Sequence, residues 1–290
     1  MNREDPQERR KRVSLDYASA VRRPPHSCCG QPPVPKGVVA KLADYDFRDM
    51  AGLPAEAVAN SFGCGNPLAF SSVAEGQVVL DLGSGAGIDL LLAAKKVGPS
   101  GRVIGVDMTE AMISKARENI AEAGLINAEV RQGLIEALPV EDASVDWVIS
   151  NCVINLSPEK HQVFAEIARV LRPGGHMLVS DIVAEQLPAE LSGNARLHSC
   201  CLAGAIPENA YLEGLRAAGL VEVEVLDRLV YDQAQIEAFI GHELVDPAAC
   251  GGDETQLART WAPRLVGKIA SARIRARKPA HSAIAPAVIA

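Results

Sequence analysis

The chain has 290 residues, of which 48% are hydrophobic and 22% are charged, and its formal net charge is −7. This length is enough to bury one full domain core with additions. The negative charge, the lack of a dense Lys/Arg run and the aromatic content of 4% argue against nucleic acid as a partner.

Cysteine usage points to a reducing compartment. The chain has seven cysteines, an odd number, and its charged N-terminus carries no apolar leader, so we expect free thiols rather than a disulfide framework. No C-x-x-C pair occurs, which argues against a zinc ribbon or a thioredoxin-type site. No uncharged apolar run approaches the ~20 residues that a membrane span needs. These features predict a cytoplasmic protein with no membrane partner.

The N-terminal region is predicted to be irregular over residues 1–40. It begins with a charged run and continues with Arg22-Arg-Pro-Pro25 and Gln31-Pro-Pro-Val-Pro35 on either side of Cys28 and Cys29. Prolines at this density favour an extended segment laid over a core, or disorder.

From residue 76 onward, short apolar runs alternate with helical segments. The predicted strands are 78–82, 102–107, 128–132, 145–150, 177–183, 221–226 and 267–277. The predicted helices are 87–97, 109–124, 157–171 and 207–218. This rhythm predicts an α/β fold with a doubly wound, mostly parallel, seven-stranded Rossmann-like sheet. Residues 186–206 break the rhythm and are expected to cap the active site.

The predicted organisation has four parts. An N-terminal arm and cap (1–60) precedes a cofactor-binding core (61–184). A substrate-side insertion with the C-terminal strands (185–278) follows, and then a disordered tail (279–290).

A glycine turn follows the first strand and opens a helix. Its sequence is Gly83-Ser-Gly85-Ala-Gly87, and Ile88 stands where the dinucleotide fingerprint needs Gly or Ala. Asp81 also places a carboxylate where a pyrophosphate would approach. Both features favour a cofactor without phosphates and with a cationic group, and S-adenosylmethionine fits. NAD, or a tight turn without any ligand, is the lesser alternative.

An acidic residue closes the second strand. Asp107 lies 20 residues after Gly87, where a carboxylate can accept hydrogen bonds from both ribose hydroxyls.

The segment from 78 to 180 resembles the class I S-adenosylmethionine-dependent methyltransferases. The matching motifs, in order, are Asp81 through Gly87, Asp107-Met-Thr109, Gly133-Leu-Ile-Glu-Ala-Leu-Pro139 and Arg169-Val-Leu-Arg-Pro-Gly-Gly175. The resemblance implies that Leu134, Ile135 and Glu136 lie against the adenine. It also implies cofactor contacts from Ser84 and Met108.

Three cysteines occupy positions that suit a thiol site. Cys152 follows the strand at 145–150, at the sheet edge where doubly wound folds bind substrates. Cys64 and Cys201 lie in segments flanking the same end. Each cysteine alone is typical of a small buried hydrophobe. Converging thiolates, however, hold soft ions. Trivalent arsenic on three sulfurs keeps a lone pair that can attack a sulfonium methyl group in line.

The sequences around these cysteines are similar to those of arsenite S-adenosylmethionine methyltransferases. The resemblance covers about residues 15–278 and rests on Phe62-Gly-Cys-Gly-Asn-Pro67, Ser150-Asn-Cys-Val-Ile-Asn-Leu156 and Cys201-Leu-Ala-Gly-Ala205. It implies that Cys64, Cys152 and Cys201 bind As(III), delivered as a thiol conjugate. It also implies that Cys28 or Cys29 joins a disulfide that reduces arsenic between methylations, with thioredoxin or small thiols resetting that disulfide.

Two departures from the family pattern leave alternatives open. His198 stands where members often have Trp, and Cys200 doubles the thiol beside Cys201, although the Leu-Ala-Gly-Ala spacing favours Cys201. The rival functions are a methyltransferase of a small organic acceptor and a non-catalytic, thiol-based arsenic-binding protein. The sequence leaves open the number of methyl groups added, activity on antimony or selenium, and the oligomeric state.

Overall fold

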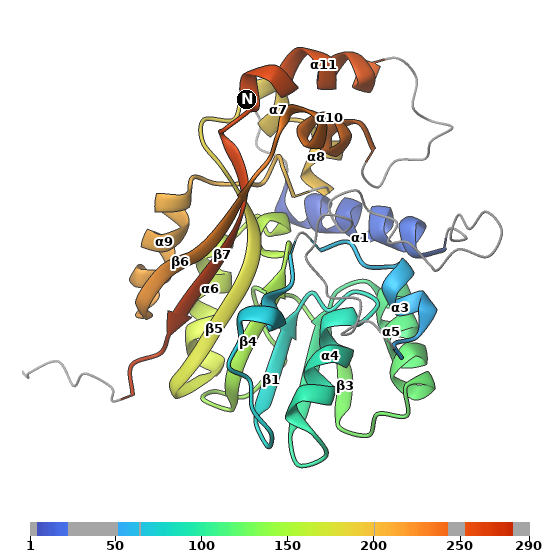
Figure 1. The fold of residues 1–290 in the computed structure, drawn as a ribbon, viewed down its shortest axis with the longest axis vertical. Helices are drawn as coiled ribbons and strands as arrows, with labels where there is room; N and C mark the ends of the chain where they lie inside the picture. The colour runs from blue at the N-terminus through green and yellow to red at the C-terminus, as the bar shows by residue number, and fades with distance from the viewer. Residues whose placement is uncertain (1–4, 23–51, 64, 200, 243–252, 281–290) are drawn as a thin grey trace, which may run out of the picture.

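A computed structural model describes residues 5–22, 52–63, 65–199, 201–242 and 253–280 of the chain (Figure 1). Its centre is a seven-stranded sheet with the order β3-β2-β1-β4-β5-β7-β6. The strands are β1 (Val78–Leu82), β2 (Arg102–Asp107), β3 (Ala128–Gln132), β4 (Val145–Asn151), β5 (Leu171–Ala184), β6 (Val221–Val230) and β7 (Ile269–Arg277). The neighbouring pairs from β3 to β5 are parallel, and β7 runs antiparallel to both β5 and β6. The predicted doubly wound, mostly parallel sheet is confirmed.

Helices cover both faces of this sheet because alternate strand residues point to opposite sides. Val79 and Val103 pack with α4 and α5 on one face, whereas Leu80 and Val106 pack with α6 and α9 on the other. The described helices are α1 (Pro6–Arg22), α3 (Ala55–Ala59), α4 (Ile88–Val97), α5 (Glu110–Glu122), α6 (Lys160–Val170), α7 (Ala189–Ser192), α8 (Ala195–Ser199), α9 (Glu208–Ala217), α10 (Gln233–His242) and α11 (Asp253–Leu265), with 3-10 turns at Pro67–Phe70 and Ile154–Leu156. In this part of the chain, no helix is both long and apolar enough to cross a bilayer.

The carboxyl end of the sheet carries a second layer of helices. Figure 1 shows α7, α8, α10 and α11 gathered above this end, with α1 crossing beneath them. Residues from these helices share an apolar cluster with Cys152 and Cys201, which includes Leu191, Leu197 and Ile236. Residues 186–206, predicted to cap this end, lie there and contain α7 and α8.

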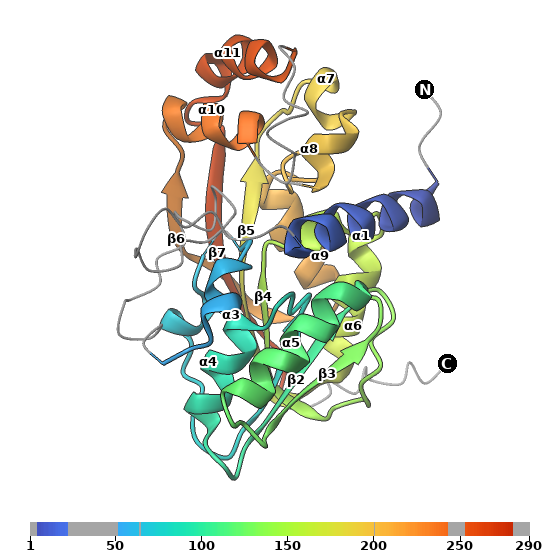
Figure 2. The same cartoon turned by 90° about the vertical axis from the view of Figure 1, so that its right-hand side faces the viewer.

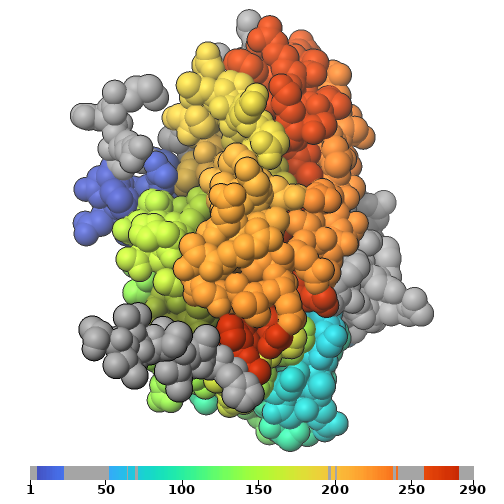
Figure 3. Space-filling model, turned by 90° about the vertical axis from the view of Figure 1, so that its left-hand side faces the viewer, coloured from blue at the N-terminus to red at the C-terminus, as the bar shows by residue number. Residues whose placement is uncertain are grey.

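A ladder of ion pairs joins β7 to β6 at the antiparallel edge of the sheet. Arg273, Arg275 and Arg277 of β7 pair with Asp227, Glu224 and Glu222 of β6. These acidic residues alternate with apolar ones along part of β6, which forms an exposed face with α9 beside it (Figure 3). At such exposed positions each pair contributes little to stability, and the ladder chiefly fixes which strand pairs with β7.

The prediction of an irregular N-terminus is wrong for residues 6–22, which form α1. Its start carries ordinary helix signals, because the Asp5 carboxylate accepts a hydrogen bond from the Gln7 N–H at 2.8 Å and Pro6 is the first helical residue. Val13, Ala20 and Val21 are buried and form an apolar stripe at helical spacing. Cys28, Cys29 and residues 281–290 of the predicted tail lie outside the described residues.

Smaller differences concern element ends. The helix predicted from residue 157 begins at Lys160, and the Ser157 hydroxyl oxygen instead accepts a hydrogen bond from the Glu159 N–H at 3.0 Å, within the preceding turn. Strand β5 begins at Leu171, six residues earlier than predicted, because a register shift against β4 accommodates Pro173 and the glycines that follow it. Helices α10 and α11 were not predicted.

Candidate active site

The glycine turn between β1 and α4 has a backbone that side chains disfavour. Gly83, Gly85 and Gly87 have φ angles of 63°, 52° and 96°. A Cβ on Gly83 would lie 2.4 Å from the Val153 side chain. The N–H groups of Gly83 and Ser84 both donate to the Val106 carbonyl oxygen, which fixes the turn against β2. Because these three residues have no side chain, a ligand can approach the backbone of the turn closely.

Asp107 fastens this turn to the end of β2. One carboxylate oxygen accepts a hydrogen bond from the Gly85 N–H at 3.0 Å, and the other accepts one from the Thr109 N–H at 2.8 Å. Burial raises the pKa of Asp107, and these hydrogen bonds oppose the rise. Each oxygen still has a lone pair that can accept a hydrogen bond from a hydroxyl group.

Asp81 and Asp89 are buried acidic residues on the wall of the same site. Burial, together with the carboxylates of Asp89 and Asp107, raises the pKa of Asp81 well above its ordinary value. One carboxylate oxygen of Asp81 is buried without a hydrogen-bond partner among the described residues. A cationic ligand beside these carboxylates would relieve both effects. Asp89, at the start of α4, was missed from the sequence, although its place right after the glycine turn was a usable signal.

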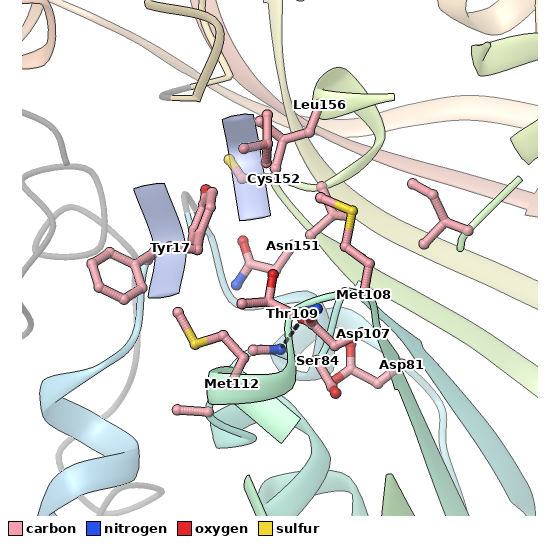
Figure 4. Close-up of a pocket in the computed structure, with 18 of the residues that line it drawn as sticks. Tyr17, Asp81, Ser84, Asp107, Met108, Thr109, Met112, Asn151, Cys152 and Leu156 are labelled. Atoms are coloured by element: carbon pink, nitrogen blue, oxygen red, sulfur yellow. Dashed lines mark hydrogen bonds between the residues drawn. The ribbon is translucent and has the colours of Figure 1, made fainter. Parts of the chain in front are cut away.

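These groups line one cavity (Figure 4). Every residue that the sequence assigned to the cofactor lies on its wall: Asp81, Gly83, Ser84, Gly85, Gly87, Asp107, Met108, Leu134, Ile135 and Glu136. Cys152 lies on the same wall. The fold thus joins the predicted cofactor residues to one of the predicted thiol residues.

Helix α1 lies against the cavity; the sequence predicted an irregular arm and cap over residues 1–60, but neither this helix nor its contacts with the cavity. Arg10, Val13 and Tyr17 line the cavity. The Arg10 guanidinium pairs with the Glu136 carboxylate at 3.1 Å and also with Glu159. The apolar and charged spacing within residues 6–22 was the missed signal.

Two of the predicted thiol residues meet at the end of β4. The Cys201 thiol donates a hydrogen bond to the backbone carbonyl oxygen of Cys152, 49 residues away in sequence. Both residues are buried, and both have left-handed backbones with φ of 68° and 59°. Such angles are unusual for residues with a side chain and persist only where the surroundings hold them.

The two sulfurs are in different states. Cys201 is not part of a disulfide, whereas Cys152 is disulfide-bonded. Cys64 also lies outside the described residues. Within the described ranges, no group of three His, Cys, Asp or Glu residues is arranged to hold a metal ion.

The glycines on either side of Cys64 lie against the ends of β4 and β5. A Cβ on Gly63 would lie 2.2 Å from the Asn151 side chain, and a Cβ on Gly65 would lie 2.6 Å from the Ser180 side chain. Asn151 also accepts a hydrogen bond from the Gly65 N–H at 3.1 Å. Since Asn151 directly precedes Cys152, the close approach explains why glycine occupies both positions.

His198 occupies the position where the sequence departed from the family pattern. Its Nε2 lies 3.1 Å from the Leu156 carbonyl oxygen. Burial lowers the pKa of His198 to about 4; the hydrogen bond to Leu156 opposes this, and the charges of Arg9, Lys160 and Arg12 add to the decrease. The side chain is therefore a neutral hydrogen-bonding group at physiological pH.

His198 should make the fold sensitive to acid. The pKa of His198 in the folded protein lies below the ordinary value of 6.5. Its contribution to the free energy of unfolding is therefore fully present above pH 6.5 and is lost as pH falls through 4. Between these limits we expect the free energy of unfolding to fall by about 3 kcal/mol more in the unmodified protein than in His198→Gln. Urea titrations at several pH values check this. Parallel pH profiles for the two proteins would contradict it.

Comparisons with known proteins agree with this arrangement. A family model described as a methyltransferase domain matches residues 74–233. An arsenite methyltransferase of Halobacterium salinarum is 42% identical over 257 residues, which is 88% of this chain and 59% of the relative. The human arsenite methyltransferase is 37% identical over 155 residues, which is 50% of this chain and 41% of the relative.

A solved structure extends the likeness to the fold. The arsenic(III) S-adenosylmethionine methyltransferase from Chlamydomonas reinhardtii has a TM-score of 0.63 and 33% identity, covering 85% of this chain and 74% of that one. The chain spans about half the length of the curated relatives it matches.

Proposed function

The chain belongs to the methyltransferase-domain family that includes the arsenite methyltransferases, and from this premise we propose that it transfers methyl groups from S-adenosylmethionine to trivalent arsenic held by cysteine thiolates. One observation carries the proposal. Cys152 lines the cavity that also contains the predicted cofactor residues, and the thiol of Cys201, from a distant segment, donates a hydrogen bond to the Cys152 carbonyl oxygen. Arsenic detoxification is the role that this activity would serve.

The cavity suits the cofactor in charge and in hydrogen bonding. Asp107 would accept the ribose hydroxyls, and Asp81 and Asp89 would face the cationic groups. Leu134, Ile135 and Glu136 would lie beside the adenine, and Met108 and the glycine turn would complete the wall. When bound, S-adenosylmethionine supplies an electrophilic methyl group on its sulfonium. The protein's part is to orient this group and to exclude water.

The thiol site would hold arsenic as a soft ligand set. Cys152 and Cys201, with Cys64, would each take the place of a small thiol on a trivalent arsenic conjugate; each new S–As bond forms as the small thiol leaves with the proton. The arsenic lone pair is the nucleophile, so no general base has to remove a proton. Catalysis would then come from positioning.

The oxidised state of Cys152 makes a reductant part of the proposal. A disulfide-bonded sulfur is not a free ligand, so the site becomes competent only after reduction. Thioredoxin or small thiols would supply the electrons, and Cys28 or Cys29 would take part in the disulfide formed between methyl transfers. A reducing cytoplasm would suit this cycle.

The experiment is mass spectrometry of arsenic species after incubation with arsenite, a thiol and S-adenosylmethionine. We expect methylated arsenic with the unmodified protein and loss of methylation in Cys152→Ser and in Cys64→Ser, with cofactor binding retained. Methylation that survives in both variants would remove the thiolate site and favour an organic acceptor. Arsenite binding without any methylated product would instead favour a non-catalytic arsenic-binding protein.

A further inference from the structure

Helix α1 reaches the segment that carries Cys201 through Ser199. The Ser199 hydroxyl donates a hydrogen bond to a carboxylate oxygen of Asp16 at 2.5 Å. The Tyr17 hydroxyl donates one to the Ser199 carbonyl oxygen at 3.2 Å. Ser199 is the last residue of α8 and is only 1% exposed. Asp16 and Tyr17 therefore hold the buried end of α8, where a carbonyl group has no partner within the helix.

Cys201 lies two residues beyond this anchor, in a turn that needs support. Its N–H donates to the His198 carbonyl oxygen at 2.9 Å, so the turn starts from the end of α8. Its φ of 68° is a conformation that residues with a side chain adopt only under constraint. The thiol itself points to the Cys152 carbonyl oxygen. The direction of the sulfur thus depends on where the end of α8 is held.

The contact with Asp16 is directional, whereas the packing around it is not. Cys201, Leu197 and Leu202 belong to an apolar cluster, and apolar burial is non-directional. A hydroxyl donating to a carboxylate is among the stronger hydrogen bonds and fixes both partners in orientation.

The two ends of α1 serve different parts of the site. Arg10 pairs with Glu136 on the cofactor side, and Tyr17 lines the cavity and packs edge-to-face against Phe62 at 5.7 Å. Asp16 is not on the cavity wall. Figure 2 shows α1 lying between α8 above and α5 and α6 below. Asp16 can therefore be altered without removing a group that faces the cofactor.

We infer that Asp16 is a positioning residue for Cys201, acting through the hydroxyl group of Ser199. With Tyr17 it sets the end of α8, and hence the direction in which the Cys201 thiol meets arsenic beside Cys152. This inference rests on the proposed function, since it assigns Asp16 to the thiol site of that reaction.

The test uses the reduced 290-residue chain, in which Cys152 and Cys201 are the only cysteines retained. The other five cysteines are replaced by serine: Cys28, Cys29, Cys64, Cys200 and Cys250. The probe is phenylarsine oxide, a trivalent arsenical that takes two thiols. In this background we expect Asp16→Ala to weaken phenylarsine oxide binding about 10-fold and to change S-adenosylmethionine affinity less than about 3-fold, both measured by calorimetry. Asp16→Asn, which keeps an acceptor, should recover most of the arsenical affinity.

A double-mutant cycle tests whether Asp16 acts on Cys201 through the hydroxyl group of Ser199. Ser199→Ala should cost about as much as Asp16→Ala, and the double variant should be little worse than either one. Arg10→Ala is the matched control on the same helix. It should weaken binding of S-adenosylmethionine more than binding of phenylarsine oxide. Additive effects of the first two variants, or unchanged arsenical affinity in Asp16→Ala, would overturn the inference.

Other outcomes separate the inference from the function on which it rests. Equal losses of arsenical and cofactor affinity in Asp16→Ala would mean that the residue only docks α1, and would overturn the positioning role alone. A parent background that fails to bind phenylarsine oxide would overturn the thiol site and the positioning role together. Thermal melts of each variant identify any that fail to fold; if Asp16→Ala is one of them, Ser199→Ala carries the comparison, and unchanged arsenical affinity in Ser199→Ala would overturn the inference.

Discussion

Replacing Cys201 by serine is expected to lower the kcat/KM of arsenite methylation by at least about 100-fold, a loss of about 2.7 kcal/mol of transition-state stabilisation. The Cys201 thiol donates a hydrogen bond to the carbonyl oxygen of Cys152, and Cys152 lines the cavity. Of the three predicted arsenic ligands, Cys152 and Cys201 are the two that lie within the described residues. Serine is close to cysteine in shape, but its hard oxygen is a poor ligand for a soft ion such as As(III).

The control is the neighbouring Cys200→Ser. Since the Leu-Ala-Gly-Ala spacing and the contact with Cys152 both favour Cys201, we expect Cys200→Ser to stay within about 3-fold of the unmodified protein. Rates are measured with labelled cofactor and excess thiol, and cofactor binding is measured alongside. A large loss in Cys200→Ser with little effect in Cys201→Ser would assign the ligand to the other member of the pair.

Replacing Asp107 by alanine is expected to weaken S-adenosylmethionine binding by about 100-fold. The change removes the carboxylate that would accept the ribose hydroxyls, and a hydrogen bond to a charged group contributes about 1.5–3 kcal/mol. It also leaves the N–H groups of Gly85 and Thr109 without their acceptor, so the glycine turn loses its tie to β2.

A graded series makes the result specific. Asp107→Asn keeps one acceptor oxygen, and its affinity should lie between those of the unmodified protein and Asp107→Ala. Glu118→Gln, on α5 with an exposed carboxylate, should leave cofactor binding unchanged. Calorimetric titration with S-adenosylmethionine measures each variant. Full affinity in Asp107→Ala would remove the ribose assignment.

The regular core was predictable because its signals are local. Strands such as 78–82 and 102–107 are short apolar runs buried on both faces, and glycines mark several of the turns between elements. The residues of the cavity wall were predictable for the same reason. Asp81, the glycine turn and Asp107 lie at the ends of consecutive strands, on one edge of the sheet.

The misses share another cause. Residues 6–22 carry the cap Asp5-Pro6 and an apolar stripe, but the many charges and the prolines that follow outweighed these signals. The stripe of α1 is buried only because the sheet offers a surface for it. Helices α10 and α11 and the early start of β5 at Leu171 depend in the same way on neighbours distant in sequence.

The sequence by itself determined the layered fold, and it predicted the residues of the cofactor site and the thiol-bearing segments, since each depends on side chains close together along the chain. Only the tertiary structure decided that the thiol of Cys201 meets the backbone of Cys152, that α1 closes the cavity through Arg10, and that Asp16 holds Ser199. Such contacts join segments more than 40 residues apart. Their geometry follows from how helices and strands pack, which no local pattern encodes.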